Sequence, residues 1–277
     1  MAYIHHEWPA ERVGRGIAAY MSGTVVGGFT GRAITGVTAA AFTWQASFVV
    51  LAVVSLAVAT GLWAWLPSEK GAARLSARKA RSPVALFQHP QLVAAYAVGF
   101  CVLCAQVAMF TYVPFPLSMA PFNLSTAALG WIFAVYLVGA VVTPFAGRWI
   151  DLRGPRITLG AAVSMGVVGS LMTLSHVLTV VIVGLSVFAT GVFVAQASAT
   201  SHVGANARED RGLAIGLYSS FYYLGGSVGG AIPALAWSRA GWPGCVALVI
   251  GVQLSTLAIA LTMWPRREGA HLEPSPL

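Results

Sequence analysis

Long apolar runs separated by short polar segments make up most of the 277-residue chain. A bilayer core about 30 Å thick requires roughly 20 apolar residues for each helix that crosses it. Eight runs are long enough, and they are continuous, whereas the strands of a membrane barrel alternate apolar and polar residues. The pattern therefore predicts an all-α membrane protein with eight transmembrane helices. The predicted spans are residues 13–35, 43–65, 91–114, 125–146, 156–175, 177–199, 212–236 and 243–264.

The composition supports the same class of protein. Hydrophobic residues make up 57 % of the chain and charged residues only 9 %, against roughly 25 % charged in a soluble domain. These values exclude a soluble enzyme, a disordered protein and a disulfide-rich secreted module. Cys101 and Cys104 share one helix face inside an apolar run, where packing is the simplest role. No nucleophile–base pair or metal-ligand spacing stands out, so we expect no enzyme, no metal and no cofactor.

The basic residues indicate a topology. Fourteen of the sixteen lysines and arginines flank the spans on one side of an alternating arrangement, and only Arg32 and Arg239 lie on the other. Cytoplasmic segments of membrane proteins are enriched in Lys and Arg. The net charge of +8 therefore reports membrane topology and not a nucleic-acid partner. We predict that the basic linker 67–90 and the tail 266–277 are cytoplasmic, and that the lipid bilayer is the main partner.

An internal repeat links the first and the seventh predicted spans. When residues 11–34 are aligned with residues 209–232, ten of 24 positions are identical, among them a tyrosine, a serine and four glycines. The copies lie six spans apart, which predicts a six-helix unit repeated in parallel orientation. Residues 91–265 would then form a complete six-helix C-terminal bundle. Residues 1–66 would supply the last two helices of an incomplete N-terminal bundle, beside it and with an open face.

Three segments resemble the major facilitator superfamily of twelve-helix secondary transporters, and more narrowly bacterial drug:proton antiporters. The first runs from Arg12 to Gly28, and the third begins at Arg211-Gly212 and includes Gly225-Gly226. The second is Gly147-Arg-Trp-Ile-Asp151-Leu-Arg153-Gly154-Pro-Arg156. The resemblance implies that the eight spans correspond to helices five to twelve of that fold. The antiporter signature has a proline and a glycine where this chain has Gly28 and Arg32.

The resemblance also implies a function, that of a secondary active transporter of the bacterial inner membrane working by alternating access. Efflux of small organic compounds in exchange for protons would be its default activity. Proton-coupled carriers generally use a titratable group inside the membrane, but no aspartate or glutamate lies inside the predicted spans. His202, at the end of a span, is more typical of a membrane interface. The alternative is a truncated, non-transporting remnant of such a carrier, because two helices cannot replace a six-helix bundle.

Polar and aromatic residues inside the spans are candidates for a substrate cavity. A charge or an amide in a membrane is costly, and it usually faces a partner or an aqueous path. Arg32 could attract an anionic substrate, or its side chain could extend to the outer interface. Each of the others could serve in packing instead. The candidates are Arg32, Gln106, Phe110, Tyr136, Gln196 and Tyr222.

Two glycine stripes are candidates for close helix contacts. Glycines four residues apart leave a smooth helix surface that another helix can approach closely. Such a contact could be static packing, a sliding gate between bundles, or both. The stripes consist of Gly23, Gly27 and Gly31 in the first span and of Gly225 and Gly229 in the seventh.

The loop before residue 156 carries a second gating candidate. In the family that it resembles, this signature latches the cytoplasmic side in one state, and a simple topological anchor is the alternative interpretation. The residues concerned are Gly147, Asp151, Arg153, Gly154 and Arg156. Tryptophans near span ends are interpreted as interface anchors, namely Trp63, Trp65 and Trp264.

Overall fold

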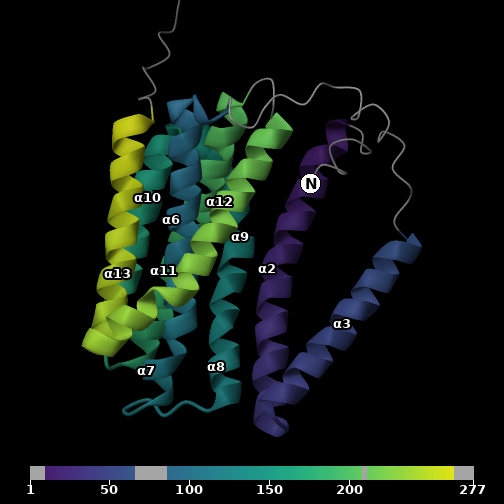
Figure 1. The fold of residues 1–277 in the computed structure, drawn as a ribbon, viewed down its shortest axis with the longest axis vertical. Helices are drawn as coiled ribbons and strands as arrows, with labels where there is room; N and C mark the ends of the chain where they lie inside the picture. The colour runs from purple at the N-terminus through teal and green to yellow at the C-terminus, as the bar shows by residue number, and fades with distance from the viewer. Residues whose placement is uncertain (1–9, 66–85, 208–210, 265–277) are drawn as a thin grey trace, which may run out of the picture.

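The computed structural model describes residues 10–65, 86–207 and 211–264, and within these ranges it contains helices and no strands (Figure 1). The first helices are α2 (Ala10–Ala41), α3 (Trp44–Trp65), α6 (Pro90–Tyr112) and α7 (Pro114–Ser118). The next are α8 (Thr126–Ile132), the 3₁₀-helix η1 (Phe133–Tyr136) and α9 (Leu137–Arg153). The last are α10 (Pro155–Met172), α11 (Leu178–Asn206), α12 (Arg211–Ala231) and α13 (Pro233–Met263).

Five helical stretches in the described residues are long and apolar enough to cross a bilayer. They are Trp44–Trp65, Pro90–Ser118, Pro155–Met172, Leu178–Asn206 and Pro233–Met263. The prediction of an all-α membrane protein is consistent with this finding. The other three predicted spans are also helical, since they coincide with α2, with α8–η1–α9 and with α12 plus the start of α13. The count of eight membrane spans stays a prediction.

The structure differs from the predicted elements in two places. The stretch 125–146 is interrupted by η1, which the apolar pattern did not indicate. The stretch 212–236 does not end where predicted, because α12 stops at Ala231 and a new helix begins at Pro233. Proline lacks the N–H that would continue the helical hydrogen bonding.

Proline and glycine set several of the helix boundaries. Prolines occupy the first position of α6, α7, α10 and α13, where an N–H has no partner within the helix in any case. Gly154 (φ 80°) connects α9 to α10, and Gly241 (φ 60°) lies at a bend inside α13. Both residues adopt the left-handed region, which glycine enters without a steric penalty. The bend at Gly241 lies in the stretch 237–242 that separates the last two predicted spans.

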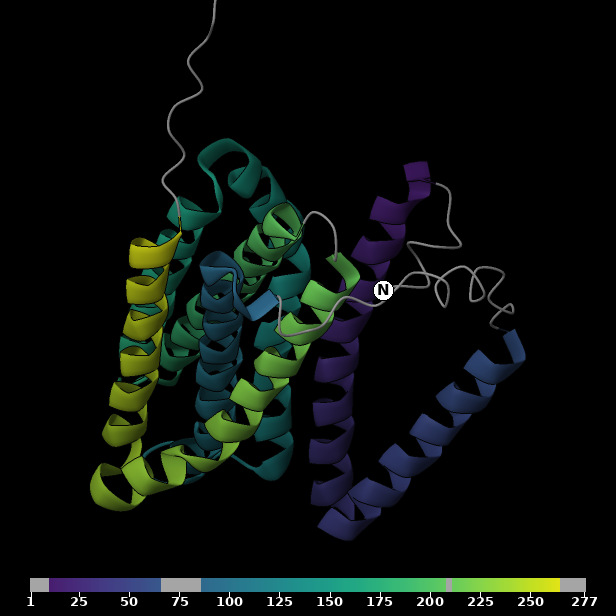
Figure 2. The ribbon, with the colours of Figure 1, turned by 45° about the horizontal axis from the view of Figure 1, so that its top comes forward.

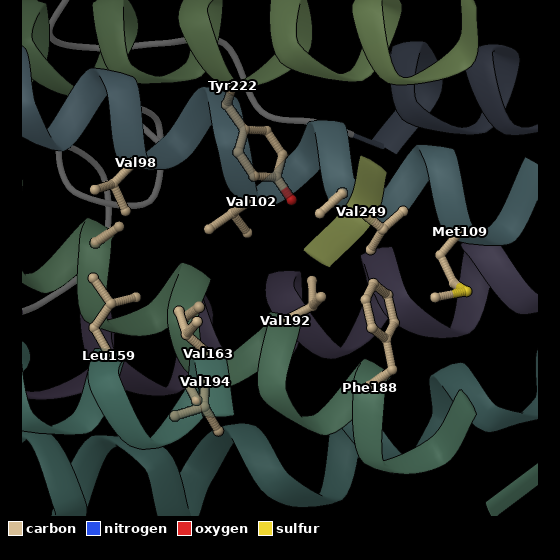
Figure 3. Packing of buried hydrophobic residues seen from close by; sticks show 14 of the residues in the cluster. Val98, Val102, Met109, Leu159, Val163, Phe188, Val192, Val194, Tyr222 and Val249 are labelled. Atoms are coloured by element: carbon tan, nitrogen blue, oxygen red, sulfur yellow. The ribbon is translucent and has the colours of Figure 1, made fainter. Parts of the chain in front are cut away.

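Helix α6 lies at the centre of a bundle formed by the elements from α6 to α13. It packs against α11, α12 and α13, while α10 packs against α9, α11 and α13. In the most apolar stretch of α6, 67 % of the residues are buried. Figure 3 shows part of the shared core, which includes Val102, Met109, Val163, Phe188, Val192 and Val249.

Helices α2 and α3 flank this bundle on one side and diverge from each other (Figures 1 and 2). α2 packs against α8, η1 and α9, whereas α3 packs against α2. Only 6 % of the most apolar stretch of α3 is buried. The eight long helical segments therefore do not form one closed bundle. That α2 and α3 belong to an incomplete N-terminal bundle stays a prediction.

The helix ends that we expect in the cytoplasm lie at the same end of the molecule. The start of α2, the start of α12 and the end of α13 lie near the top of Figure 1, and α3 runs upward in the same direction but ends lower. This arrangement agrees with an alternating topology, and the side that faces the cytoplasm stays a prediction. Most of the predicted linker 67–90 and all of the tail 266–277 lie outside the described residues.

Candidate functional site

A cluster of aromatic side chains lies where α2 meets the bundle. The rings of Phe110 in α6 and Tyr136 in η1 have centroids 4.4 Å apart. Phe133 stacks on Tyr136 at 6.0 Å with an interplanar angle of 9°. A 3₁₀-helix has three residues per turn, so that side chains at i and i+3 are eclipsed. The short 3₁₀ segment thus holds Phe133 and Tyr136 on one side of the chain, facing α6 and α2.

Arg32 of α2 reaches over these rings. Its guanidinium carbon lies 4.9 Å from the centroid of Phe133 and 5.3 Å from that of Tyr136. A cation over an aromatic face is attracted by the ring quadrupole. One guanidinium nitrogen, Nη1, donates a hydrogen bond to the carbonyl of Gly28 at 3.1 Å. The side chain is therefore directed across to η1, and its role in a substrate cavity stays a prediction.

Two polar side chains of the bundle border the same place. Gln106 is buried, its side chain lies beside the Tyr136 hydroxyl, and its Oε1 has no hydrogen-bond partner. Tyr222 of α12 is buried near Tyr136, and its ring lies 6.0 Å from that of Tyr218. A buried acceptor without a partner is costly. We use the name junction site for the group Arg32, Gln106, Phe110, Phe133, Tyr136 and Tyr222.

The structure thus brings together five of the six predicted cavity residues. Gln196 is half-buried on α11, and its backbone carbonyl accepts a hydrogen bond from Thr200 at 2.9 Å. Within the described residues, no hydrogen bond or ring contact joins its side chain to the junction site. Sequence reasoning missed Phe133, which is brought beside Tyr136 by the 3₁₀ segment that the apolar pattern did not indicate. It also missed Phe188 and Phe193, whose rings lie 5.9 Å from Phe110 and 6.0 Å from Tyr136.

The predicted loop signature lies at the opposite end of the helices. Gly147, Asp151 and Arg153 are exposed, whereas Gly154 is buried at the turn between α9 and α10. Arg156 donates hydrogen bonds to the carbonyl oxygens of Leu261 at 2.5 Å and Trp264 at 2.9 Å. These carbonyls end α13 and have no partner within their own helix. Arg156 therefore ties the start of α10 to the end of α13, and the latch that the family resemblance implies stays a prediction.

Two aromatic residues at this end differ from expectation. Trp264 is only 2 % exposed and His202 only 3 %, so in this structure neither lies at a surface as an interface residue would. Their rings stack at 4.0 Å with an interplanar angle of 10°. Trp264 leaves α13 with extended backbone (ψ 133°), which turns its ring inward over α11. By contrast, Trp63 and Trp65 on α3 are almost fully exposed.

The two glycine stripes have different surroundings. A Cβ atom at Gly225 or Gly229 would collide with the carbonyl oxygens of Phe100 and Cys104, so α12 lies directly against the α6 backbone. At Gly23, Gly27 and Gly31 a Cβ atom would meet nothing within 4 Å in the described chain. The sliding-gate role of either stripe stays a prediction.

Another pair of glycines brings α2 against α8. A Cβ atom at Gly36 would lie 2.9 Å from the Cα atom of Gly130, and one at Gly130 would lie 3.1 Å from the Cα atom of Gly36. Sequence reasoning did not single out this pair, because Gly36 falls outside the four-residue spacing of the first stripe.

The described residues offer no metal centre. Among them, no three histidine, cysteine, aspartate or glutamate side chains are grouped closely enough to hold a metal ion. Cys101, Cys104 and Cys245 are free thiols, and the last two are buried. The chemistry available at the junction site is thus that of binding: one cation, aromatic faces, an amide and phenolic hydroxyls.

Comparison with known proteins assigns the whole chain to the family that its sequence motifs resemble. The model of the Major Facilitator Superfamily matches residues 1–119 and 115–277. The chain is 29 % identical over 267 residues to the MFS-type transporter YybF of Bacillus subtilis, covering 95 % of this chain and 65 % of that protein. It is 30 % identical over 272 residues to the inner membrane transport protein YnfM of Escherichia coli, covering 92 % and 64 %.

A shorter match joins the chain to a resistance protein. Over 156 residues it is 31 % identical to the chloramphenicol resistance protein of Streptomyces lividans, covering 54 % of this chain and 38 % of that protein. The chain spans about two thirds of the length of the longer relatives that it matches.

Proposed function

Because the chain belongs to the major facilitator superfamily, whose members are membrane transporters and not enzymes, we propose that it works by alternating access with the junction site as its substrate cavity. The bilayer and a small-molecule substrate are the partners that the family implies. The observation that carries the proposal is the contact of Arg32 with Tyr136 between α2 and the bundle, because Tyr136 also lies near Gln106 and Tyr222. In transporters with parallel repeats, one repeat rocks against the other around such a site.

The direction and the driving ion belong to the same proposal. Efflux of small organic compounds from a bacterial inner membrane is supported by the likeness to a chloramphenicol resistance protein and to YnfM. The described residues contain two carboxylates, Glu11 and Asp151, and both lie near helix ends. We therefore propose that any proton-coupling carboxylate lies outside the described residues. The linker 67–90 and the tail face the cytoplasm in this proposal, because basic segments stay inside.

A second candidate is a non-transporting remnant of such a carrier. It is motivated by the limited packing of the two N-terminal helices, since α2 contacts the bundle whereas only 6 % of the most apolar stretch of α3 is buried. The two candidates differ in whether the chain moves a compound across the membrane.

An accumulation assay in cells separates them. Cells that express the chain would be loaded with neutral chloramphenicol, cationic ethidium or anionic fluorescein, with and without a protonophore. The proposal expects at least one probe to accumulate less than in cells with an empty vector, and the protonophore to abolish the difference.

Tyr136→Phe should reduce export, because it removes the buried hydroxyl beside Gln106. The matched control Tyr223→Phe, on a residue 69 % exposed, should not. If each of the three probes accumulated to the same level as in cells with an empty vector, with the chain present in the membrane, the result would instead support the non-transporting remnant.

A further inference from the structure

The junction site holds an arginine that lies far from Asp151, the carboxylate whose side chain the structure describes. Nine residues separate Arg32 from the end of α2 at Ala41, which at 1.5 Å per residue places it about 14 Å from that end. Glu11 lies 21 residues earlier on the same helix, or about 31 Å away. Asp151 follows Tyr136 by 15 residues along η1 and α9, or about 22 Å. Asp151 is therefore too far away to neutralise the guanidinium, and a charge at this depth calls for a partner.

Contacts hold the guanidinium of Arg32 in place but leave most of its N–H donors available. Phe133 and Tyr136 are nearly parallel, and together they support the cation from one side. Arginine has five N–H donors in a planar fork that matches a carboxylate. One described hydrogen bond, to the Gly28 carbonyl, occupies Nη1. The side chain is exposed, so its remaining donors are accessible to a ligand that enters between α2 and the bundle.

The bundle side of the site holds a buried acceptor without a partner. Gln106 Oε1 is buried without a partner, even though the Gln106 side chain lies beside the Tyr136 hydroxyl. A ligand with an O–H or N–H group would supply that partner, and aromatic faces favour a flat ring. The junction site therefore favours a ligand that has a negative charge on one side and a hydrogen-bond donor on the other.

We propose that the junction site selects small aromatic carboxylates that carry a hydroxyl or amino group. The carboxylate pairs with Arg32, the ring lies along the aromatic side chains, and the donor group faces Gln106. This inference rests on the proposed role of the junction site as the substrate cavity, and it adds the charge and class of the substrate.

Equilibrium binding to the purified chain in nanodiscs of neutral phosphatidylcholine tests the inference. The probe is labelled 4-hydroxybenzoate, and the competitors are 4-hydroxybenzamide, its neutral isostere, and 4-hydroxybenzylamine, a cation. Charge-assisted hydrogen bonds are roughly twice as strong as neutral ones, so the carboxylate should bind about tenfold more tightly than the amide. Arg32→Gln should remove that preference, and Arg32→Lys should retain part of it. Arg239→Gln, on an exposed arginine outside the site, should leave it unchanged.

The outcomes separate the substrate class from the transport function. If the amide or the amine bound as tightly as the carboxylate, or if none of the three bound, the inference would be overturned. It would also be overturned if the preference survived Arg32→Gln. If anionic phosphatidylglycerol in the nanodisc displaced the probe, Arg32 would be a lipid-headgroup site and the inference would again fail. Export of ethidium or chloramphenicol in the cell assay would still support transport in each of these cases. Conversely, Arg32-dependent binding without export of any probe would count against transport alone.

Discussion

Helices α12 and α2 carry the same glycine pattern but use it differently. In the internal repeat Gly225 and Gly229 align with Gly27 and Gly31. On α12 these glycines allow backbone contact with α6, whereas on α2 the equivalent positions face open space in the described chain. The tight approach of α2 occurs instead at Gly36, opposite Gly130. A glycine stripe therefore marks a surface on which a helix can be approached, and the neighbouring elements decide whether the approach takes place.

The largest difference is expected between matched substitutions at Gly229 and Gly27. Gly229→Val would drive a branched side chain into the α6 backbone at Cys104, and it should lower the free energy of unfolding by about 3 kcal/mol. Gly27→Val meets no neighbour, and because valine is a better helix former than glycine it should be neutral or slightly stabilising. Unfolding of the purified variants in mixed micelles would measure both. Similar losses for the two variants would mean that both stripes are packed.

A smaller effect is expected where α2 meets α8. Gly36→Ala would place a methyl group 2.9 Å from the Cα atom of Gly130, so one helix must move by a few tenths of an ångström. Overpacking of this kind should cost about 1–2 kcal/mol of unfolding free energy. Gly31→Ala is the control five residues earlier, with nothing within 4 Å. If the control lost as much stability as Gly36→Ala, the contact surface of α2 would lie at the stripe after all.

The smallest loss of unfolding free energy is expected where Arg156 joins the start of α10 to the end of α13. Arg156→Met keeps the aliphatic stem but removes the donors to the Leu261 and Trp264 carbonyls. Because Arg156 is partly exposed, water replaces part of the loss, and about 1 kcal/mol is expected. Hydrogen exchange of the amides at 260–264 should become faster. Arg153→Met, on an exposed side chain, is the comparison and should leave this exchange unchanged.

The helical segments could be predicted because the length of an apolar run is a direct requirement of the bilayer. The gap between the last two predicted spans, residues 237–242, contains the bend at Gly241. η1 and the break at Ile232 were missed, since both lie inside runs that stay apolar throughout. Hydropathy records how much of a segment is apolar and carries little information on local changes of helix type.

The sequence predicted the polar residues of the junction site, but it did not identify all of the aromatic residues that belong to the site. Arg32, Gln106 and Tyr136 stand out as polar groups in apolar helices, so their cost in a membrane identified them. Phe133 did not stand out, because an aromatic residue is ordinary in a membrane span. Trp264 was expected at an interface from its position near a span end, but its direction depends on the backbone after α13. Which way a side chain points depends on neighbours that are distant in sequence.

The exposure of α3 has a consequence for the order of assembly. A helix whose whole circumference is apolar satisfies its backbone hydrogen bonds internally, and lipid solvates its side chains as well as protein would. Helix α3 can therefore enter the bilayer as an independent unit during synthesis. Helix α6, by contrast, buries most of its surface against α11, α12 and α13, which are made later. Helix α3 is thus stable in lipid as soon as it is inserted, whereas α6 can reach its final packing only after the C-terminal helices have been translated.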